Sequence, residues 1–199
     1  MNVTSKLVPE LSPKLWTKLL PKLLMYVFIT LWLASVAEFF FFIMSYESKA
    51  GPSSKAPARL PQNSKISQDS KSFNLLVFVH PKCPCSRATI GELQKLVHSA
   101  KNLNTTIFLL SPEPVSTSWN NTPLEQRARE IPRATVYCDR NGNMARAFSA
   151  KTSGQVILYN PSGKLIFSGG ITAARGKEGR NAGALRILSL LENGDTQSK

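Results

Sequence analysis

Two of the three cysteines in this chain are separated by a single residue, in the stretch Cys83-Pro84-Cys85-Ser86. A disulfide between residues this close closes too small a loop to restrict an unfolded chain, so the pair is not expected to stabilise a fold. Two neighbouring thiols indicate local redox chemistry or a metal site instead. Three cysteines in 199 residues also exclude a disulfide-rich scaffold.

Cys83 is predicted to lie at the start of a helix. Residues 74–80 are a short apolar run typical of a buried strand, and residues 84–101 carry apolar side chains at helical spacing. The unpaired N–H groups and the positive dipole end of a helix favour a thiolate, and we expect Lys82 and Arg87 to add positive charge. A thiolate is the attacking species in disulfide exchange, so this placement would activate Cys83.

The one-residue spacing restricts what the two cysteines can do. Pro84 suits the first helical position, because the N–H that proline lacks would be unpaired there. A disulfide between Cys83 and Cys85 needs Cα atoms about 4.4–6.8 Å apart, which requires backbone that leaves helical geometry. Such a bond would be strained, and therefore oxidising and easily reduced.

His80 lies three residues before Cys83, at the end of the predicted strand. It would either tune the thiolate, cap the polar end of the strand, or ligate a metal. His80, Cys83 and Cys85 together would suit Cu(I), which prefers soft thiolate ligands, whereas a closed zinc site needs a fourth ligand. Redox chemistry without a cofactor and copper binding are therefore both open.

The third cysteine, Cys138, ends another predicted strand, 134–138. If that strand lies two positions from the strand at 74–80, about 10 Å separate them, which is beyond disulfide reach. We expect Cys138 to be a small buried hydrophobe, with a resolving role as the alternative. His98 falls in the middle of a predicted helix and is expected to have no role in the site.

The N-terminal part of the chain predicts a single-pass membrane anchor. Residues 23–44 hold one charge in 22 residues, which is long enough to span a bilayer. The lysines of residues 1–22 predict a cytoplasmic N-terminus, and hence an extracytoplasmic domain, periplasmic in a bacterium. A cleaved signal peptide, cut after Ser35-Val36-Ala37, is the alternative, but the apolar run continues beyond that site.

Composition divides the rest of the chain. Residues 45–72 are rich in serine, lysine and proline, which predicts a disordered linker. We expect a folded domain over 73–194 and a short tail over 195–199. The net charge of +13 is spread along the chain without a dense basic run, which argues against nucleic-acid binding and favours an anionic membrane surface.

Strands and helices alternate through the domain. Strands are predicted at 74–80, 105–110, 134–138, 155–159 and 164–168, and helices at 84–101, 123–131, 143–150 and 182–191. This order predicts an α/β fold with a mostly parallel sheet, a C-terminal β-hairpin, and helices on both faces.

A buried strand that leads into a cysteine pair opening a helix, followed by this order of elements, resembles the thioredoxin-like superfamily over about 73–192. The additional strand and helix at 134–150 and the turn Asn160-Pro161-Ser162-Gly163 resemble its TlpA and peroxiredoxin-type branch. The stretch 80–86, taken with Ser168-Gly169-Gly170-Ile171-Thr172 and Arg175-Gly176, is similar to a RedB-type subgroup. The resemblance implies a thiol–disulfide oxidoreductase, with Cys83 as nucleophile and Cys85 as resolving partner, acting on a protein thiol or disulfide.

Two departures from the family pattern concern the site itself. Ser86 occupies the position of the family's second cysteine, so the usual two-residue spacing is lost. Gly154 occupies the position of the family's cis-proline, and glycine admits close backbone approach without enforcing a cis peptide.

The glycine-rich stretch 169–181 is expected either to contact a substrate or an anion, mainly through Arg175, or to be a plain surface loop. A non-catalytic scaffold that kept the fold is a further alternative.

Overall fold

The computed structural model describes residues 13–48, 55–61, 66, 71–113, 119 and 121–196. The chain forms two compact units, Met1–Lys49 and Ala50–Lys199. Each unit is described below by itself.

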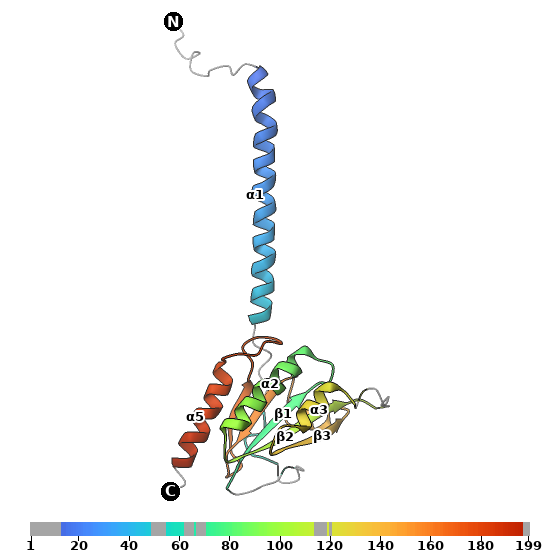
Figure 1. The fold of residues 1–199 in the computed structure, drawn as a ribbon, viewed down its shortest axis with the longest axis vertical. Coiled ribbons are helices and arrows are strands. Elements are labelled where there is room, and N and C mark those ends of the chain that lie inside the picture. The colour runs from blue at the N-terminus through green and yellow to red at the C-terminus, as the bar shows by residue number, and fades with distance from the viewer. Residues whose placement is uncertain are drawn as a thin grey trace. The chain divides into compact units, whose positions relative to one another are not determined.

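The first unit contains one long helix, α1 (Pro13–Ser48), drawn in blue in Figure 1. Its stretch Trp16–Glu47 is long and apolar enough to cross a membrane, a test that signal sequences also pass. The helix extends beyond the predicted span of 23–44 at both ends. At the N-terminal end the flanking leucines and lysines are good helix formers, so residues 13–22 are helical and continuous with the span.

The second unit is built on a five-stranded sheet in the order β3-β2-β1-β4-β5. Its strands are β1 (Phe73–Val79), β2 (Leu103–Ser111), β3 (Ala134–Arg140), β4 (Gln155–Tyr159) and β5 (Leu165–Gly170). The first three are parallel, while β4 runs antiparallel to β1 and to β5. This confirms the predicted mixed sheet with a C-terminal hairpin.

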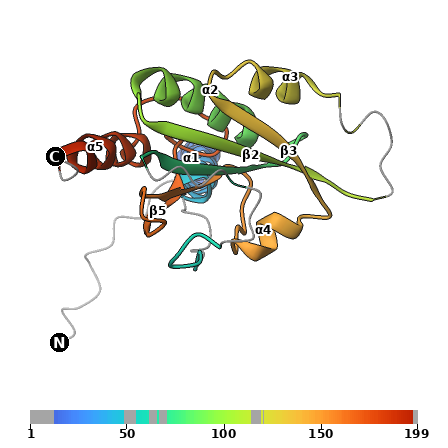
Figure 2. The ribbon, with the colours of Figure 1, turned by 90° about the horizontal axis from the view of Figure 1, so that it is seen from below.

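Helices cover both faces of the sheet, as predicted. They are α2 (Pro84–Ser99), α3 (Pro123–Arg129), α4 (Asn143–Ala147) and α5 (Ala182–Thr196). Side chains of α2, α3 and α5 pack against one face, and α4 packs against the other, which Figure 2 shows edge-on. Every residue of β1 is buried, because this central strand is covered from both sides. The C-terminal end of β1, which leads into Cys83, is therefore held firmly.

The predicted linker is wrong at residues 55–61 and at Ile66. Leu60 and Ile66 are 7% and 6% exposed on the face that α4 covers. The backbone N–H of Leu60 donates to Gly163 O at 2.8 Å, and Leu165 N–H donates to Ala58 O at 3.0 Å. The composition resembles a linker, but the short α4 leaves part of this face open. A few apolar side chains of residues 55–61, which we call the strap, cover it.

The other linker residues lie outside the described part of the chain, apart from residues 45–48 in α1 and residues 71–72 just before β1. At the far end, α5 continues to Thr196, so the predicted tail begins inside the last helix.

Candidate active site

Cys83 is the N-cap residue of α2, as predicted. Its backbone is extended, with φ −94° and ψ 129°, so it stands just outside the helix that Pro84 begins. The N–H of Cys83 donates to His80 O at 3.1 Å, which turns the chain sharply between β1 and α2. The Cys83 side chain is half-buried at this turn.

The pKa of Cys83 is lowered, although burial by itself would raise it. The lowering comes from the backbone N–H groups of Cys85 and Ser86, followed by the side chains of Cys85 and Ser153. These groups are two backbone N–H groups at the helix N-terminus and two neighbouring side chains; the Ser86 N–H also donates to Cys83 O at 3.1 Å. They stabilise the thiolate because a hydrogen bond to the charged form favours that form.

The expected contribution of the neighbouring cations is not what lowers this pKa. The Nζ of Lys82 lies 4.4 Å from the centre of the Trp119 ring, and the Arg87 side chain is exposed. Short-range hydrogen bonds outweigh exposed charges here, because water screens a charge at the surface. Lys82 and Arg87 are thus not among the groups that lower the pKa of Cys83, and their effect on its reactivity stays a prediction.

Cys85 shows the opposite shift. Burial raises its pKa, and the hydrogen bond to Cys83 and the negative charge there raise it further. The N–H of Gly176 and the charge of Arg175 act in the opposite direction but do not reverse the shift. Both cysteines are free, and the opposite shifts favour the charged form at Cys83 and the neutral form at Cys85.

A network of two serines supports the turn before α2. Ser86 is fully buried, and its hydroxyl donates to His80 O at 2.8 Å and lies 2.7 Å from the Ser153 hydroxyl. The N–H of His80 donates to both hydroxyl oxygens, at 3.0 and 2.9 Å. Ser86 thus holds the turn, while Ser153 links it to the Cys83 sulfur. Ser153 was missed from the sequence, because nothing near residue 153 signals a contact with residue 83.

His80 takes a structural place beside the thiols. Its Nδ1 accepts a hydrogen bond from the N–H of Lys82 at 3.1 Å, and its ring meets Trp119 edge-on at 5.4 Å. Within the described ranges, no three His, Cys, Asp or Glu side chains are grouped closely enough to hold a metal ion. The copper alternative therefore finds no preformed set of three ligands there.

Gly154 brings a second segment against the first turn of α2. Its φ of +88° belongs to the left-handed region that glycine tolerates, and a Cβ there would lie 2.5 Å from Thr89 Oγ1. The Thr89 hydroxyl in turn donates to Cys85 O at 3.0 Å. The N–H of Gly154 donates to Phe78 O at 2.7 Å, so this glycine joins β1 to α2.

Arg175 is carried to the site by a tight turn. Lys177 N–H donates to Ala174 O at 3.1 Å, which leaves Arg175 and Gly176 at the tip. Gly176 has φ +68°, and a Cβ there would lie 3.7 Å from the Cβ of Pro84. The tip therefore rests on the first residue of α2, next to Cys85. The stretch 169–181 is thus more than a plain surface loop.

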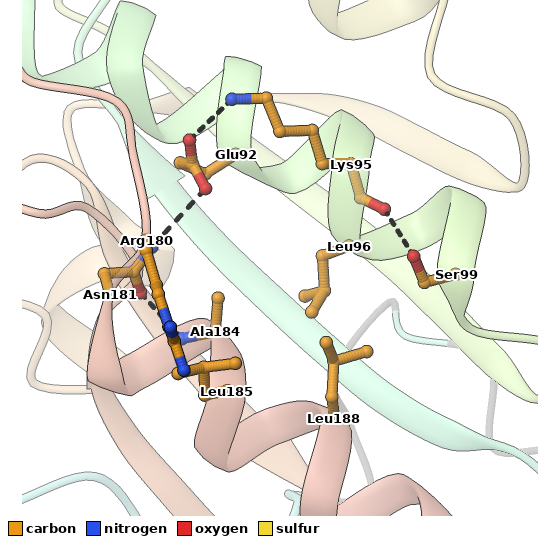
Figure 3. Close-up of a pocket in the computed structure, with 9 residues that line it drawn as sticks. All are labelled: Glu92, Lys95, Leu96, Ser99, Arg180, Asn181, Ala184, Leu185 and Leu188. Carbon is orange, nitrogen blue, oxygen red and sulfur yellow. Dashed lines mark hydrogen bonds and ion pairs between the residues drawn. The ribbon is translucent and has the colours of Figure 1, made fainter.

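A buried carboxylate fastens this loop to α2, as Figure 3 shows. Glu92 is 6% exposed, accepts from Lys95 at 2.7 Å and from Gly179 N–H at 2.9 Å, and lies 3.4 Å from Asn181 Nδ2. Burial would raise the pKa of Glu92, but these hydrogen bonds and the Lys95 charge lower it. Glu178 adds an ion pair to Lys95 at 3.0 Å. In the sequence, Glu92 is an ordinary helical glutamate, and only its burial reveals this role.

Cys138 is exposed, so the prediction of a buried hydrophobe is wrong. Strand β3 is an edge of the sheet, and the edge leaves the Cys138 side chain open to solvent although its neighbours pack on the core. Cys138 is paired with Leu109, which is paired with Val79, so it lies two strands away from the end of β1. The structure brings together Cys83, Cys85, Ser86, His80, Pro84, Gly154 and Arg175, and leaves Cys138 apart.

The strand order and pairing are those of a thioredoxin-like fold. The crystal structure of an uncharacterized conserved protein from Geobacillus kaustophilus is similar at 17% identity, with 73% of this chain and 80% of that chain covered and a TM-score of 0.51. A secreted disulfide oxidoreductase of Mycobacterium tuberculosis, homologous to E. coli DsbE, is 14% identical, with 62% and 84% covered and a TM-score of 0.46.

A thioredoxin-like protein from Aeropyrum pernix is 11% identical, with 80% and 96% covered and a TM-score of 0.47. No protein-family model and no curated protein matches the chain. Identities this low speak for the fold alone, so the chemistry of the chain is argued from its own residues.

Proposed function

We propose that this protein is a thiol–disulfide oxidoreductase that uses Cys83 as nucleophile and Cys85 as resolving thiol. One observation carries the proposal: two free thiols lie at the N-terminus of α2, Cys83 at the N-cap and Cys85 in the first turn, and their pKa values are shifted in opposite directions. A lowered pKa favours the ionised form of the attacking sulfur, and a raised pKa favours the protonated form of the second sulfur. This asymmetry supports catalysis over the non-catalytic scaffold.

The exchange runs in two steps. The Cys83 thiolate attacks one sulfur of a partner's disulfide, forms a mixed disulfide, and releases the other partner sulfur as a thiolate, which takes a proton from water. Cys85 then gives up its proton and attacks the Cys83 sulfur, which releases the second partner thiol and leaves a Cys83–Cys85 disulfide. The partner gains two electrons, and an external dithiol returns the pair to its reduced form. All steps are reversible, so the same site can oxidise a partner's dithiol.

The backbone at Cys83 supports the second step. A disulfide between such close neighbours requires geometry outside a helix, and Cys83 is extended at the N-cap while Cys85 lies in the first turn. Each cysteine side chain also shifts the pKa of the other, which supports their acting as a pair.

We further propose that α1 anchors the domain in a membrane by a single pass, with the N-terminus cytoplasmic and the domain extracytoplasmic. The length and hydropathy of Trp16–Glu47 and the lysines that precede residue 23 support this. The expressed chain should stay in the membrane pellet after alkaline carbonate extraction at its full mass of 21.9 kDa. A soluble product that has lost residues 1–37 would show a cleaved signal peptide instead.

Trapping of mixed disulfides tests the exchange mechanism. The full chain in detergent micelles is mixed with insulin, and dithiothreitol-sensitive adducts are resolved on non-reducing gels. The Cys85→Ser variant should accumulate an adduct, because its second step is blocked, whereas Cys83→Ser should form none. Cys138→Ser is the matched control and should behave as the wild type. If the wild type does not reduce insulin and Cys85→Ser traps nothing, the proposed function is wrong.

A further inference from the structure

Exposed basic residues lie on the segments that carry or contact the two thiols. Lys82 precedes Cys83, and Arg87 lies in the first turn of α2, which Cys83 precedes as the N-cap residue. Arg175 and Lys177 belong to the tight turn that rests on Pro84. All four side chains are exposed, and we call these four residues the basic rim.

Three acidic side chains near the basic rim pair with cations outside it. Glu92 is buried and pairs with Lys95, and Glu178 pairs with the same lysine at 3.0 Å. At the same edge of the sheet, Glu113 lies 3.6 Å from Arg140. The basic rim thus brings four cations to a region where two carboxylates share one lysine and a third pairs with Arg140.

The basic rim comes from two stretches of chain: residues 82–87, which lead into the first turn of α2, and the turn at 174–177. Two hollows in the described part, of about 160 and 110 Å³, are lined by other residues. An open, wide basic surface fits an extended segment better than a small molecule, which would need an enclosing pocket.

We propose that the basic rim selects the partner: a peptide segment that carries acidic residues beside its reactive cysteine. This rests on the proposed exchange function and names its substrate class. Charges of opposite sign raise the rate of encounter and disfavour a basic partner, and the effect falls with salt. Arg175 acts as a specificity-determining residue, since its turn is fastened to α2 by Glu92 and cannot simply swing away.

Alkylation of Cys83 measures the local electrostatic potential and requires no redox turnover. The Cys138→Ser chain in detergent micelles is treated with iodoacetate or iodoacetamide, and the Cys83 peptide is quantified by mass spectrometry. Both reagents react with the same thiolate, but only iodoacetate is negatively charged. The ratio of the iodoacetate rate to the iodoacetamide rate is therefore independent of the pKa of Cys83. The ratio should exceed that of glutathione several-fold at low salt, and Arg175→Ala should lower it about threefold, as expected for one charge removed at the surface.

Two controls accompany this measurement. Arg175→Lys should restore the ratio, and Arg186→Ala, an exposed arginine on α5, should leave it unchanged. If the wild-type ratio equals that of glutathione, or if Arg186→Ala lowers it as much as Arg175→Ala does, the basic rim does not set the potential and the proposal is wrong.

Turnover then identifies the partner class. Two matched peptide disulfides are compared, with the cysteine flanked by glutamates or by lysines, and with oxidised glutathione as a small anionic probe. The acidic peptide should be reduced about tenfold faster than the basic one at low salt, and the difference should shrink in Arg175→Ala and in high salt. Equal rates for the two peptides would overturn the proposal while the exchange function stands.

Two further outcomes are also decisive. Reduction of oxidised glutathione as fast as the acidic peptide would assign the site to small anionic disulfides and reject the peptide segment. Reduction of none of the three, with the alkylation ratio still raised, would reject the exchange function and with it this partner.

Discussion

The hydroxyl oxygens of Ser86 and Ser153 lie 2.7 Å apart although 67 positions separate the two residues. Ser86 stands at the position where the thioredoxin-like pattern has its second cysteine, and it is fully buried. Ser153 takes part in the same network, and its side chain is among the groups that lower the pKa of Cys83. The residue that replaces the usual thiol therefore holds the turn in place, and its neighbour helps to ionise the remaining nucleophile.

Replacement of Ser153 tests this contact. Ser153→Ala removes one donor to the Cys83 thiolate, so the pKa of Cys83 should rise and the stability should fall by about 1 kcal/mol. The pH dependence of iodoacetamide labelling at Cys83 measures the pKa. Ser99→Ala, an exposed serine at the end of α2, is the matched control and should leave the profile unchanged. A profile of Ser153→Ala that overlays the wild type would contradict the assigned contact.

Gly154 should not tolerate a side chain. Gly154→Ala combines a positive φ with a Cβ only 2.5 Å from Thr89 Oγ1, so we expect a loss of about 1–3 kcal/mol in the free energy of unfolding. Gly163→Ala is a matched control, since φ there is +75° but the nearest side-chain atom lies 3.7 Å away. The control should cost less, because it carries the strain without the clash.

The added variant Thr89→Ala separates the two causes further. Removing the Thr89 hydroxyl should recover part of the stability lost in Gly154→Ala and nothing in Gly163→Ala. Equal losses in both glycine variants, with no recovery, would mean that the close approach of residue 154 to α2 has no energetic consequence.

The loop over the site should loosen in acid. The pKa of Glu92 is lowered in the folded chain, so its contribution is fully present above the ordinary value of about 4.3 and is lost as the pH falls through the lower folded value. The hydrogen-exchange protection of the Gly179 amide should therefore fall in the wild type below about pH 4.3. At each pH, this protection is compared with that of the same amide in Glu92→Gln. Glu92→Gln should be less protected at neutral pH and should show little change across this window. Parallel curves for the two proteins would exclude Glu92 as the fastening group.

The strap should be an integral part of the domain. Leu60→Ala removes a side chain that is 7% exposed, and a buried leucine replaced by alanine typically costs about 2–5 kcal/mol. Limited proteolysis near residue 60 should accelerate strongly in this variant. Leu185→Ala, at a leucine that is 47% exposed, provides the comparison and should change little. A strap cleaved equally fast in the wild type and in Leu60→Ala would mean that it is not packed on the sheet.

Much of the fold was predictable because it depends on local patterns. Apolar runs such as residues 74–80 and helical spacing in residues 84–101 correspond to β1 and α2 within a few residues. The position of Cys83 at a helix start followed from the same reasoning. The approach of Gly154 to the thiols was anticipated through the family resemblance, because family patterns carry long-range information that spacing alone does not. Arg175 was expected only to contact a substrate or an anion.

Other features were decided only by the tertiary structure. Ser153, Glu92 and the strap act through partners that are about 70 to 105 positions away in the chain. Cys138 was expected to be buried because its strand is apolar, but whether a strand lies at the centre or at the edge of a sheet is a matter of topology.

The sequence by itself determined the position of the proposed nucleophile, since a cysteine placed before a proline at a helix start lies beside the N–H groups of the first turn wherever that helix packs. The tertiary structure decided how the pKa values of the two thiols differ. Ser153 and the Arg175–Gly176 turn reach the sulfurs from other parts of the chain, and their hydrogen bonds and charge act only over a few ångströms. Interactions of such short range exist only once folding has brought distant segments together.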